Sequence, residues 1–163
     1  MKRIPLMAVI LTLTMYMVSC TKSSSNGYSA CTNVPINNDT AALMAFARIN
    51  GLAVTQDTSG LYYEIVTQGY GSSSPLLTST IFVTYTGTLL NGTVIDSTSD
   101  ATKTGYVLNT LIPAWQIGLQ KIRAGGRIKL LCPSDLAYGC LGAGTIVAPN
   151  TPLYYDITLV SFQ

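Results

Sequence analysis

Two β-forming runs joined by a tight turn are the strongest constraint on how this 163-residue chain folds. In the first run, Thr80–Leu89, every second residue falls on one face, which carries Ile81, Val83 and Tyr85. A period of two is the pattern of a β-strand with one buried face. Asn91-Gly92 follows and favours the positive φ values of a hairpin turn, and Thr93–Asp96 returns as a second strand. This region predicts an antiparallel hairpin.

The rest of the chain adds further strands and one main helix. Runs rich in β-branched and aromatic residues predict strands at Leu61–Val66, Tyr106–Leu108, Arg127–Cys132 and Pro152–Phe162. Pro113–Ile122 predicts a helix that a proline opens and that carries the only tryptophan, Trp115. Because a sheet needs one face covered, we expect this helix to pack against it. The predicted fold class is α+β, an antiparallel twisted β-sheet wrapped around one short α-helix.

A second short helix is predicted ahead of this domain. Asp39-Thr40 supplies an N-cap and Gly51 a stop for a helix over residues 41–50, with Leu43, Phe46 and Ala47 on one face and Ile49 at its margin. The helix packs against the main domain, contacts a second copy or acts as a spacer, and the sequence does not choose. We therefore expect an N-terminal extension at residues 39–59 and the main domain at 60–163.

The first residues predict an export signal. Lys2 and Arg3 precede an apolar run, and Met17-Val-Ser-Cys20 resembles the lipobox of bacterial lipoproteins. We expect residues 1–19 to be a lipoprotein signal peptide, Cys20 to carry the lipid, and the polar residues 20–38 to form a flexible tether. An ordinary secretory signal is the alternative. The predicted location is the cell envelope, lipid-anchored on the extracytoplasmic side (the periplasm), and Thr21 after the cysteine favours the outer membrane.

The composition excludes several kinds of chemistry. The chain has no histidine, which removes His-dependent triads, His general bases and His-ligated metals. Its 7 acidic residues make a carboxylate metal cluster improbable. The formal net charge of +2 rests on Lys2 and Arg3, so cleavage after Ser19 leaves a neutral chain with scattered basic residues. That pattern argues against a nucleic-acid partner.

The cysteines beyond Cys20 leave two interpretations open. Cys132 and Cys140 enclose a short loop and lack the paired spacing of a zinc site. Outside the cytosol a disulfide between them can persist, and two small buried thiols are the alternative. Cys31 lies in the expected tether and is left without a partner.

Three blocks of residues, in their order and spacing, resemble the FKBP-type peptidyl-prolyl isomerases. They are the hairpin Phe82–Ser97, the segment Leu111-Ile-Pro-Ala-Trp-Gln-Ile-Gly-Leu119 and the loop Pro133-Ser-Asp-Leu-Ala-Tyr-Gly139. The resemblance covers residues 60–163. It implies a sheet wrapped around a helix, catalysis of X–Pro rotation, and no cofactor or metal. Taken alone, each aromatic residue is more typical of an ordinary core or half-buried strand position, and only their joint order favours a functional site.

The resemblance also implies the site residues. Those in catalytic positions are Tyr85, Asp96, Trp115, Tyr138 and Tyr155, and those in substrate-binding positions are Ile95, Tyr106, Leu111, Ile112 and Val147. It makes Trp115 the floor under the prolyl ring, the Tyr138 hydroxyl and the Ile112 amide donors to substrate carbonyls, and Asp96 the residue that orients Tyr85. Ile95 stands where the family commonly has phenylalanine, which removes a ring from the wall.

The implied partners are proline-containing unfolded or exported polypeptides, with tacrolimus-like macrolides as candidate ligands. The function so predicted is a peptidyl-prolyl cis-trans isomerase that assists the folding of exported proteins. One alternative is a binding or chaperone module of low activity tethered to the membrane. Another is a structural lipoprotein whose aromatic residues are only core, although such a protein has no reason to keep Asp96 beside them.

Overall fold

The computed structural model describes residues 31–163, which cluster as one compact unit. The predicted signal peptide and the predicted lipidation site, Cys20, lie outside the described residues. Among residues 31–163, no helix is long and apolar enough to span a bilayer.

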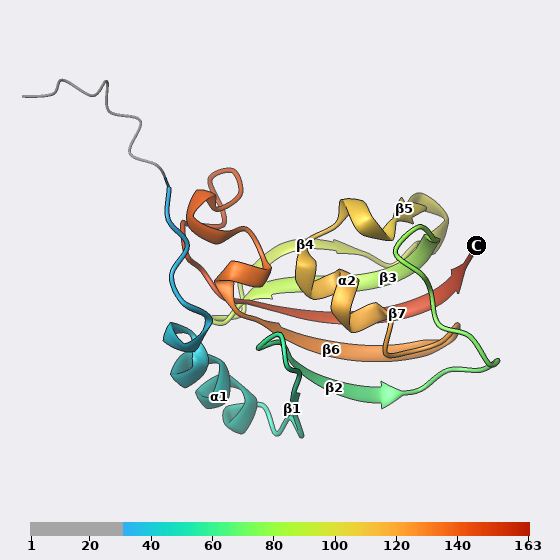
Figure 1. Ribbon diagram of the computed structural model, residues 1–163, viewed down its shortest axis with the longest axis horizontal. Coiled ribbons are helices and arrows are strands. Elements are labelled where there is room, and N and C mark those ends of the chain that lie inside the picture. The colour runs from blue at the N-terminus through green and yellow to red at the C-terminus, as the bar shows by residue number, and fades with distance from the viewer. Residues whose placement is uncertain (1–30) are drawn as a thin grey trace, which may run out of the picture. The chain divides into compact units, whose positions relative to one another are not determined.

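An antiparallel sheet forms the framework of the domain (Figure 1). Its strands are β1 Thr55–Gln56, β2 Tyr62–Thr67, β3 Thr80–Leu89, β4 Val94–Thr98, β5 Tyr106–Val107, β6 Gly126–Cys132 and β7 Leu153–Phe162. The order is β1-β2-β6-β7-β3-β4, and β5 pairs with the start of β3. The predicted hairpin is β3–β4, which places Gly87 opposite Asp96. Register shifts interrupt the pairing of β3 with β4 and with β7, and such bulges increase strand twist.

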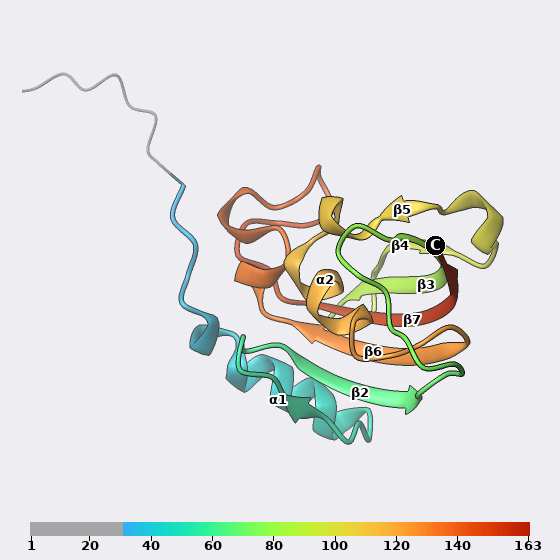
Figure 2. The same cartoon turned by 45° about the vertical axis from the view of Figure 1, so that its right-hand side comes forward.

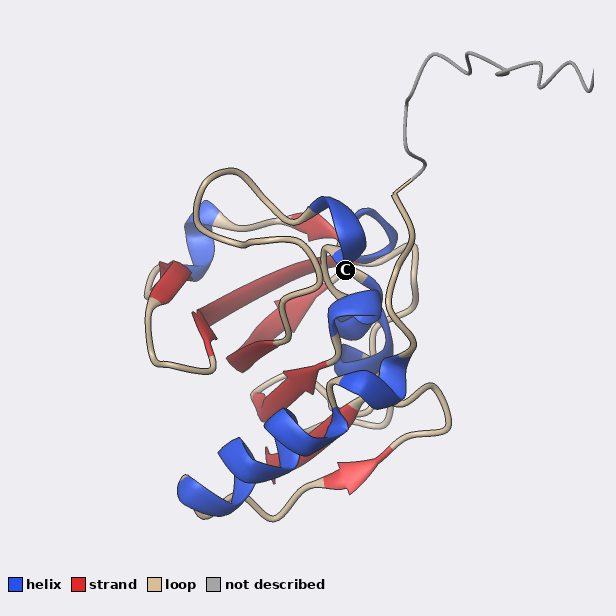
Figure 3. Cartoon of the chain, turned by 90° about the vertical axis from the view of Figure 1, so that its left-hand side faces the viewer, coloured by secondary structure: helices blue, strands red, loops and turns tan. Residues whose placement is uncertain are grey.

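The helices are short pieces arranged around the strands, as Figure 3 shows. The α-helices are α1 Thr40–Ile49 and α2 Pro113–Leu119. The 3₁₀ turns are η1 Ile36–Asn38, η2 Ala101–Lys103, η3 Leu108–Thr110, η4 Ser134–Leu136 and η5 Gly139–Leu141. Together with the sheet they confirm the predicted α+β class, with one short helix on the sheet and a helix ahead of it.

The two α-helices lie on opposite faces of the sheet (Figure 2). The face toward α2 carries the larger core, in which Trp115 and Leu119 of α2 pack against Leu130 of β6. Gly118 permits this approach, because a Cβ there would lie 2.6 Å from the Leu130 side chain. The α2 face of the sheet is therefore the face on which the predicted site residues gather.

The face toward α1 carries a smaller core. Leu43 and Ala47 of α1 pack against Tyr62 of β2 and Leu131 of β6. The ring of Phe46 lies 5.1 Å from that of Tyr154 on β7. Ile49 is 80% exposed and belongs to neither core. Of the roles that the sequence left open for this helix, the structure shows packing against the main domain.

Asp39 does not cap α1 through its side chain, contrary to prediction. Its own backbone is in the right-handed helical region rather than the extended conformation of a typical N-cap. Its carboxylate instead accepts hydrogen bonds from the amide and the hydroxyl of Ser134, both at 2.7 Å. Asp39 and Ser134 are both buried, so this pair fastens the start of α1 to η4.

The predicted Cys132–Cys140 disulfide is wrong. Cys140 is bonded to Cys31, with 5.6 Å between their Cα atoms, and Cys132 is a free thiol. The reason is strand alternation: Cys132 ends β6 opposite Leu153 with its side chain in the core, where burial raises the pKa of its thiol. The disulfide also corrects the tether prediction, because residues 31–38 are bound to the domain rather than free.

Candidate active site

A cavity of about 310 Å³ opens beside α2 on the larger-core face. Its lining comes from β3, β4, β5, η3, the η3–α2 connection, α2, the loop after η4 and β7. The lining residues are Tyr85, Asp96, Tyr106, Thr110, Leu111, Ile112, Trp115, Tyr138 and Tyr155. Residues that are up to 70 positions apart in the chain, from Tyr85 to Tyr155, thus meet around one space.

Trp115 contacts two tyrosine rings in this cavity. The Tyr85 ring meets it edge to face at 4.9 Å and 84°, and the Tyr155 ring at 5.4 Å and 89°. Edge-to-face pairs of this kind fix ring orientation and stabilise by about 0.5–1.5 kcal/mol each beyond burial. The Trp115 side chain is 4% exposed, and its Nε1 has no hydrogen-bond partner among the described residues. It presents a rigid, apolar surface with one unused donor.

The Tyr85 hydroxyl donates a hydrogen bond to Asp96 Oδ2 at 2.6 Å. The β3–β4 hairpin makes this possible, since Asp96 pairs with Gly87 on the strand that carries Tyr85. Burial, followed by the hydrogen bonds with Asp96 and Tyr106, raises the pKa of Tyr85 above its ordinary value. The phenol therefore stays protonated and acts only as a donor to the carboxylate at neutral pH.

Tyr155 stands on β7 beside Gly87 of β3. A Cβ at Gly87 would overlap the Tyr155 ring, so the glycine creates the space in which that ring lies. Burial is the main cause that raises the pKa of Tyr155, and the neighbouring Tyr138 hydroxyl adds to it. Tyr138 itself is 38% exposed and brings a hydroxyl to the mouth of the cavity.

Leu111 and Ile112 form the short connection that leads into α2. Ile112 is the N-cap residue, and its carbonyl accepts from the Trp115 amide at 3.0 Å. The Gln116 side chain donates to the Leu111 carbonyl at 2.7 Å and so ties the connection to the helix. Within residues 31–163 no hydrogen bond to the Ile112 amide is present, which leaves that donor at the cavity edge.

The structure brings together most, but not all, of the predicted site residues. Ile95 and Val147 do not line the cavity; they pack in and against the core around it. Thr110 lines the cavity and was not predicted, and neither was the supporting role of Gly87. A glycine inside the alternating β3 run was the one available signal for a close approach. Thr110 gave none, because its hydroxyl bonds to the Val107 carbonyl as in any turn.

Together these features define a class of protein: an α+β domain with an aromatic cleft, hydrogen-bond donors at its edge and no cluster of metal ligands among the described residues. A family model described as FKBP-type peptidyl-prolyl cis-trans isomerase matches residues 71–160. The chain belongs to this family.

Individual relatives agree with the family match. The chain is 41% identical to the outer membrane protein MIP of Legionella longbeachae over 106 residues, which are 64% of this chain and 45% of that protein. It is 39% identical to FkpA of Aeromonas hydrophila over 122 residues, which are 74% of this chain and 44% of that one. The chain thus spans about half the length of the curated relatives it matches.

A solved structure shows the same fold. The crystal structure of FkpA from Escherichia coli superposes with a TM-score of 0.66 at 33% identity, covering 78% of this chain and 58% of that one. The predicted FKBP-like architecture is therefore confirmed.

Proposed function

We propose that this protein catalyses cis-trans isomerisation of X–Pro bonds in polypeptides, without covalent chemistry or a cofactor. The observation that carries the proposal is the cavity in which Trp115, Tyr85 and Tyr155 meet edge to face, with Asp96 holding Tyr85. Membership of the isomerase family supports the same reaction.

The reaction suits an aromatic cleft of this kind. Unaided rotation about an X–Pro bond takes tens to hundreds of seconds, and no bond is broken. In the planar amide, resonance places extra negative charge on the carbonyl oxygen, whereas in the twisted transition state that resonance is lost. An apolar, water-poor pocket disfavours the more polar planar state more than the twisted one. Binding energy is thereby used on the transition state.

Each residue of the cleft has a proposed part. The prolyl ring rests on Trp115, and the Tyr138 hydroxyl donates to the carbonyl of the residue before proline. The Ile112 amide, which has no internal partner, donates to a neighbouring substrate carbonyl. Asp96 positions Tyr85, and Tyr106, Leu111 and Tyr155 complete the apolar wall. Ile95 and Val147 act from behind, since they pack against the core and do not reach the cavity.

Peptides with a bulky apolar residue before proline test the activity. We expect the full-length protein to accelerate their cis-trans exchange, measured by NMR exchange spectroscopy on the peptide. Peptides with an acidic residue in that position serve as the comparison, because the side chains beside the cleft are mostly apolar. Exchange no faster than in buffer across the whole panel would replace the enzyme by the alternative, a binding or chaperone module.

We propose further that the protein works on exported polypeptides while anchored by lipid on Cys20. The Cys31–Cys140 disulfide supports a compartment outside the cytosol, where such bonds persist. One relative is itself named an outer membrane protein. Two or more acyl chains give stable anchoring, so wild-type protein should sediment with membranes and Cys20→Ala should not. Soluble wild-type protein with another mature N-terminus would leave an ordinary secreted form.

A further inference from the structure

The segment at residues 31–39 runs beside the loop that presents Tyr138, although the two are more than ninety positions apart in sequence (Figure 1). The first link between them is the disulfide from Cys31 to Cys140, across a separation of 109 residues. Cys140 belongs to η5, directly after Tyr138-Gly139. A covalent bond thus joins the N-terminal segment to the immediate neighbourhood of a cavity residue.

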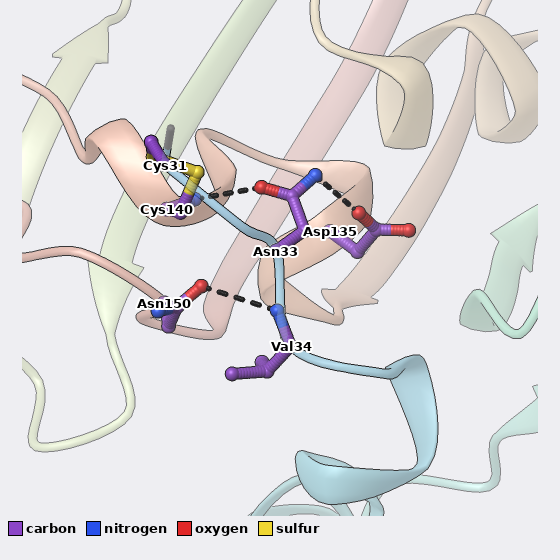
Figure 4. Close-up of a disulfide and its surroundings, with 6 residues drawn as sticks. All are labelled: Cys31, Asn33, Val34, Asp135, Cys140 and Asn150. Carbon is purple, nitrogen blue, oxygen red and sulfur yellow. Dashed lines mark hydrogen bonds between the residues drawn. A yellow bond between two sulfur atoms is a disulfide. The ribbon is translucent and has the colours of Figure 1, made fainter. Parts of the chain in front are cut away.

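The Asn33 side chain is the second link, as Figure 4 shows. Its Oδ1 accepts a hydrogen bond from the Cys140 amide at 2.8 Å, and its Nδ2 donates to Asp135 Oδ1. The Asn33 side-chain amide lies against Gly139, which has a positive φ of 54°. A Cβ at Gly139 would overlap Asn33 Oδ1. Asn33 therefore fits onto the loop on both sides of Tyr138.

Hydrogen bonds at two further places join residues 31–39 to the loop that presents Tyr138. The Val34 backbone amide donates to the side-chain oxygen Oδ1 of Asn150 at 3.4 Å, and the backbone amide of Asn150 donates to the Gly139 carbonyl at 2.8 Å. At the other end, the buried Asp39 carboxylate holds Ser134 by two hydrogen bonds. The residues before Tyr138 and those after it are thus both fastened to the same N-terminal segment.

The loop has little regular structure of its own to replace these contacts. Between β6 and β7 it contains the turns η4 and η5 and the isolated bridge Ala143–Val147. Irregular loop backbone of this kind opens more readily than strands paired on both sides. The position of the Tyr138 hydroxyl in the cavity therefore depends on what holds the loop from outside.

We propose that residues 31–39 are a positioning element of the proline-binding site, acting through the Cys31–Cys140 bond and Asn33 on the loop that presents Tyr138. This rests on the proposed function, because Tyr138 matters only if the cleft binds an X–Pro substrate. The element lies outside residues 71–160, which the family model matches. A dithiol opens it: two electrons and two protons pass to the Cys31 and Cys140 sulfurs, and the dithiol becomes a cyclic disulfide.

The first test compares oxidised full-length protein with protein reduced by dithiothreitol under native conditions. Reduction should lower kcat/KM by about threefold to tenfold, the equivalent of roughly one hydrogen bond to substrate, mainly through a higher KM. Amide hydrogen exchange should rise at residues 138–142 and stay unchanged in β3 and β7. The double variant Cys31→Ser/Cys140→Ser should match the reduced protein and no longer respond to dithiothreitol. Cys132→Ala keeps the bridge and should still respond.

The second test exchanges the polar partners of Asn33. Asn33→Asp places a carboxylate against Asp135, so we expect it to raise exchange at residues 138–142 and to raise KM. Adding Asp135→Asn restores a hydrogen-bond donor at position 135 facing the carboxylate at position 33. Both the exchange at residues 138–142 and KM should then return toward the wild-type values. Asn37→Ala is the matched control, an exposed asparagine in the same segment. Recovery in the swapped pair would assign the effect to the contact between positions 33 and 135, and unchanged exchange in β3 and β7 would separate that effect from a loss of global stability.

Two results would overturn the proposal. One is unchanged KM and unchanged exchange at residues 138–142 after the disulfide is reduced. The other is a rise in exchange that spreads equally through β3 and β7, since the contacts would then support the whole domain. If the oxidised wild type accelerates no X–Pro peptide, the proposed function fails. The exchange data still show whether the element holds the loop, so the two failures are distinguishable.

Discussion

Tyr85 and Tyr138 both line the cleft, but different kinds of structure hold them in place. Tyr85 lies in the middle of β3, paired with Thr98 of β4 on one side and Ile157 of β7 on the other. Tyr138 lies in an irregular loop that a disulfide and side-chain hydrogen bonds fasten to residues 31–39. Tyr85 is 9% exposed and Tyr138 38%. One wall is built by sheet pairing and the other by distant cross-links.

The comparison teaches how the two walls respond to change. Hydrogen bonds along β3 are cooperative and shielded, so its side chains move only if the sheet opens. The Tyr138 loop can shift while the sheet remains folded, because a disulfide and side-chain hydrogen bonds hold it rather than sheet pairing. Substitutions on the sheet wall should therefore alter stability and activity together, whereas those on the loop wall should alter substrate binding first.

The largest loss of stability and activity is expected at Trp115, the floor of the cleft. Trp115→Ala removes a buried ring that contacts Tyr85 and Tyr155, and truncation of this kind costs about 3–5 kcal/mol of unfolding free energy. Isomerase activity should be lost with it. Urea denaturation and peptide exchange measure the two effects. Trp115→Phe keeps a ring and should recover much of the stability, and a fully stable, active Trp115→Ala would show that the floor lies elsewhere.

On the sheet wall, Asp96→Ala should lower kcat/KM by about tenfold to a hundredfold, the worth of a hydrogen bond to a charged group. The reason is that the Tyr85 hydroxyl loses its acceptor at 2.6 Å and the ring is no longer fixed. Asp96→Asn retains an acceptor oxygen, so its kcat/KM should lie between those of the wild type and Asp96→Ala. Steady-state kinetics on one good peptide gives the comparison. Normal kinetics in a folded Asp96→Ala protein would count against the pair.

On the loop wall, Tyr138→Phe should lower kcat/KM by about twofold to tenfold, because one neutral hydrogen bond is lost while the apolar surface stays. Thermal unfolding should be nearly unchanged, since the hydroxyl is at the surface. The effect should shrink further in the Cys31→Ser/Cys140→Ser background, where the loop is already released. If Tyr138→Phe lowers kcat/KM equally in the wild-type and the Cys31→Ser/Cys140→Ser backgrounds, Tyr138 acts independently of residues 31–39.

The smallest effect at ordinary pH concerns Tyr85 and Tyr155, the buried tyrosines of the cleft. Their pKa values in the folded protein are raised above the ordinary 10.0, so the unfolded chain loses protons first as pH rises. Stability should be constant below about pH 9 and fall above pH 10, because there the unfolded state binds fewer protons than the folded state. Urea midpoints from pH 8 to 11 measure this. Tyr85→Phe should flatten the curve, and Tyr70→Phe, at an exposed position, is the control.

Local signals in the sequence were sufficient for the sheet wall. Alternation in residues 80–89 and the Asn91-Gly92 turn predicted the hairpin that brings Asp96 to Tyr85. The helix signal at Pro113 placed Trp115, although α2 ends at Leu119 rather than Ile122. These features are readable because their residues lie close in sequence and obey a fixed period.

The loop wall was decided by the tertiary structure. Which cysteine Cys140 meets, where the Asp39 carboxylate goes and what the Asn33 amide binds depend on contacts across about a hundred residues. No local period encodes such contacts, and four cysteines leave their pairing open. The sequence alone determined the fold class and the hairpin, because strand alternation and turn chemistry act locally, and its resemblance to the FKBP family supplied most of the cleft residues. Only the folded chain determined that its N-terminal segment contacts the loop that carries Tyr138, because that contact exists only once β6 and β7 have brought this loop beside residues 31–39.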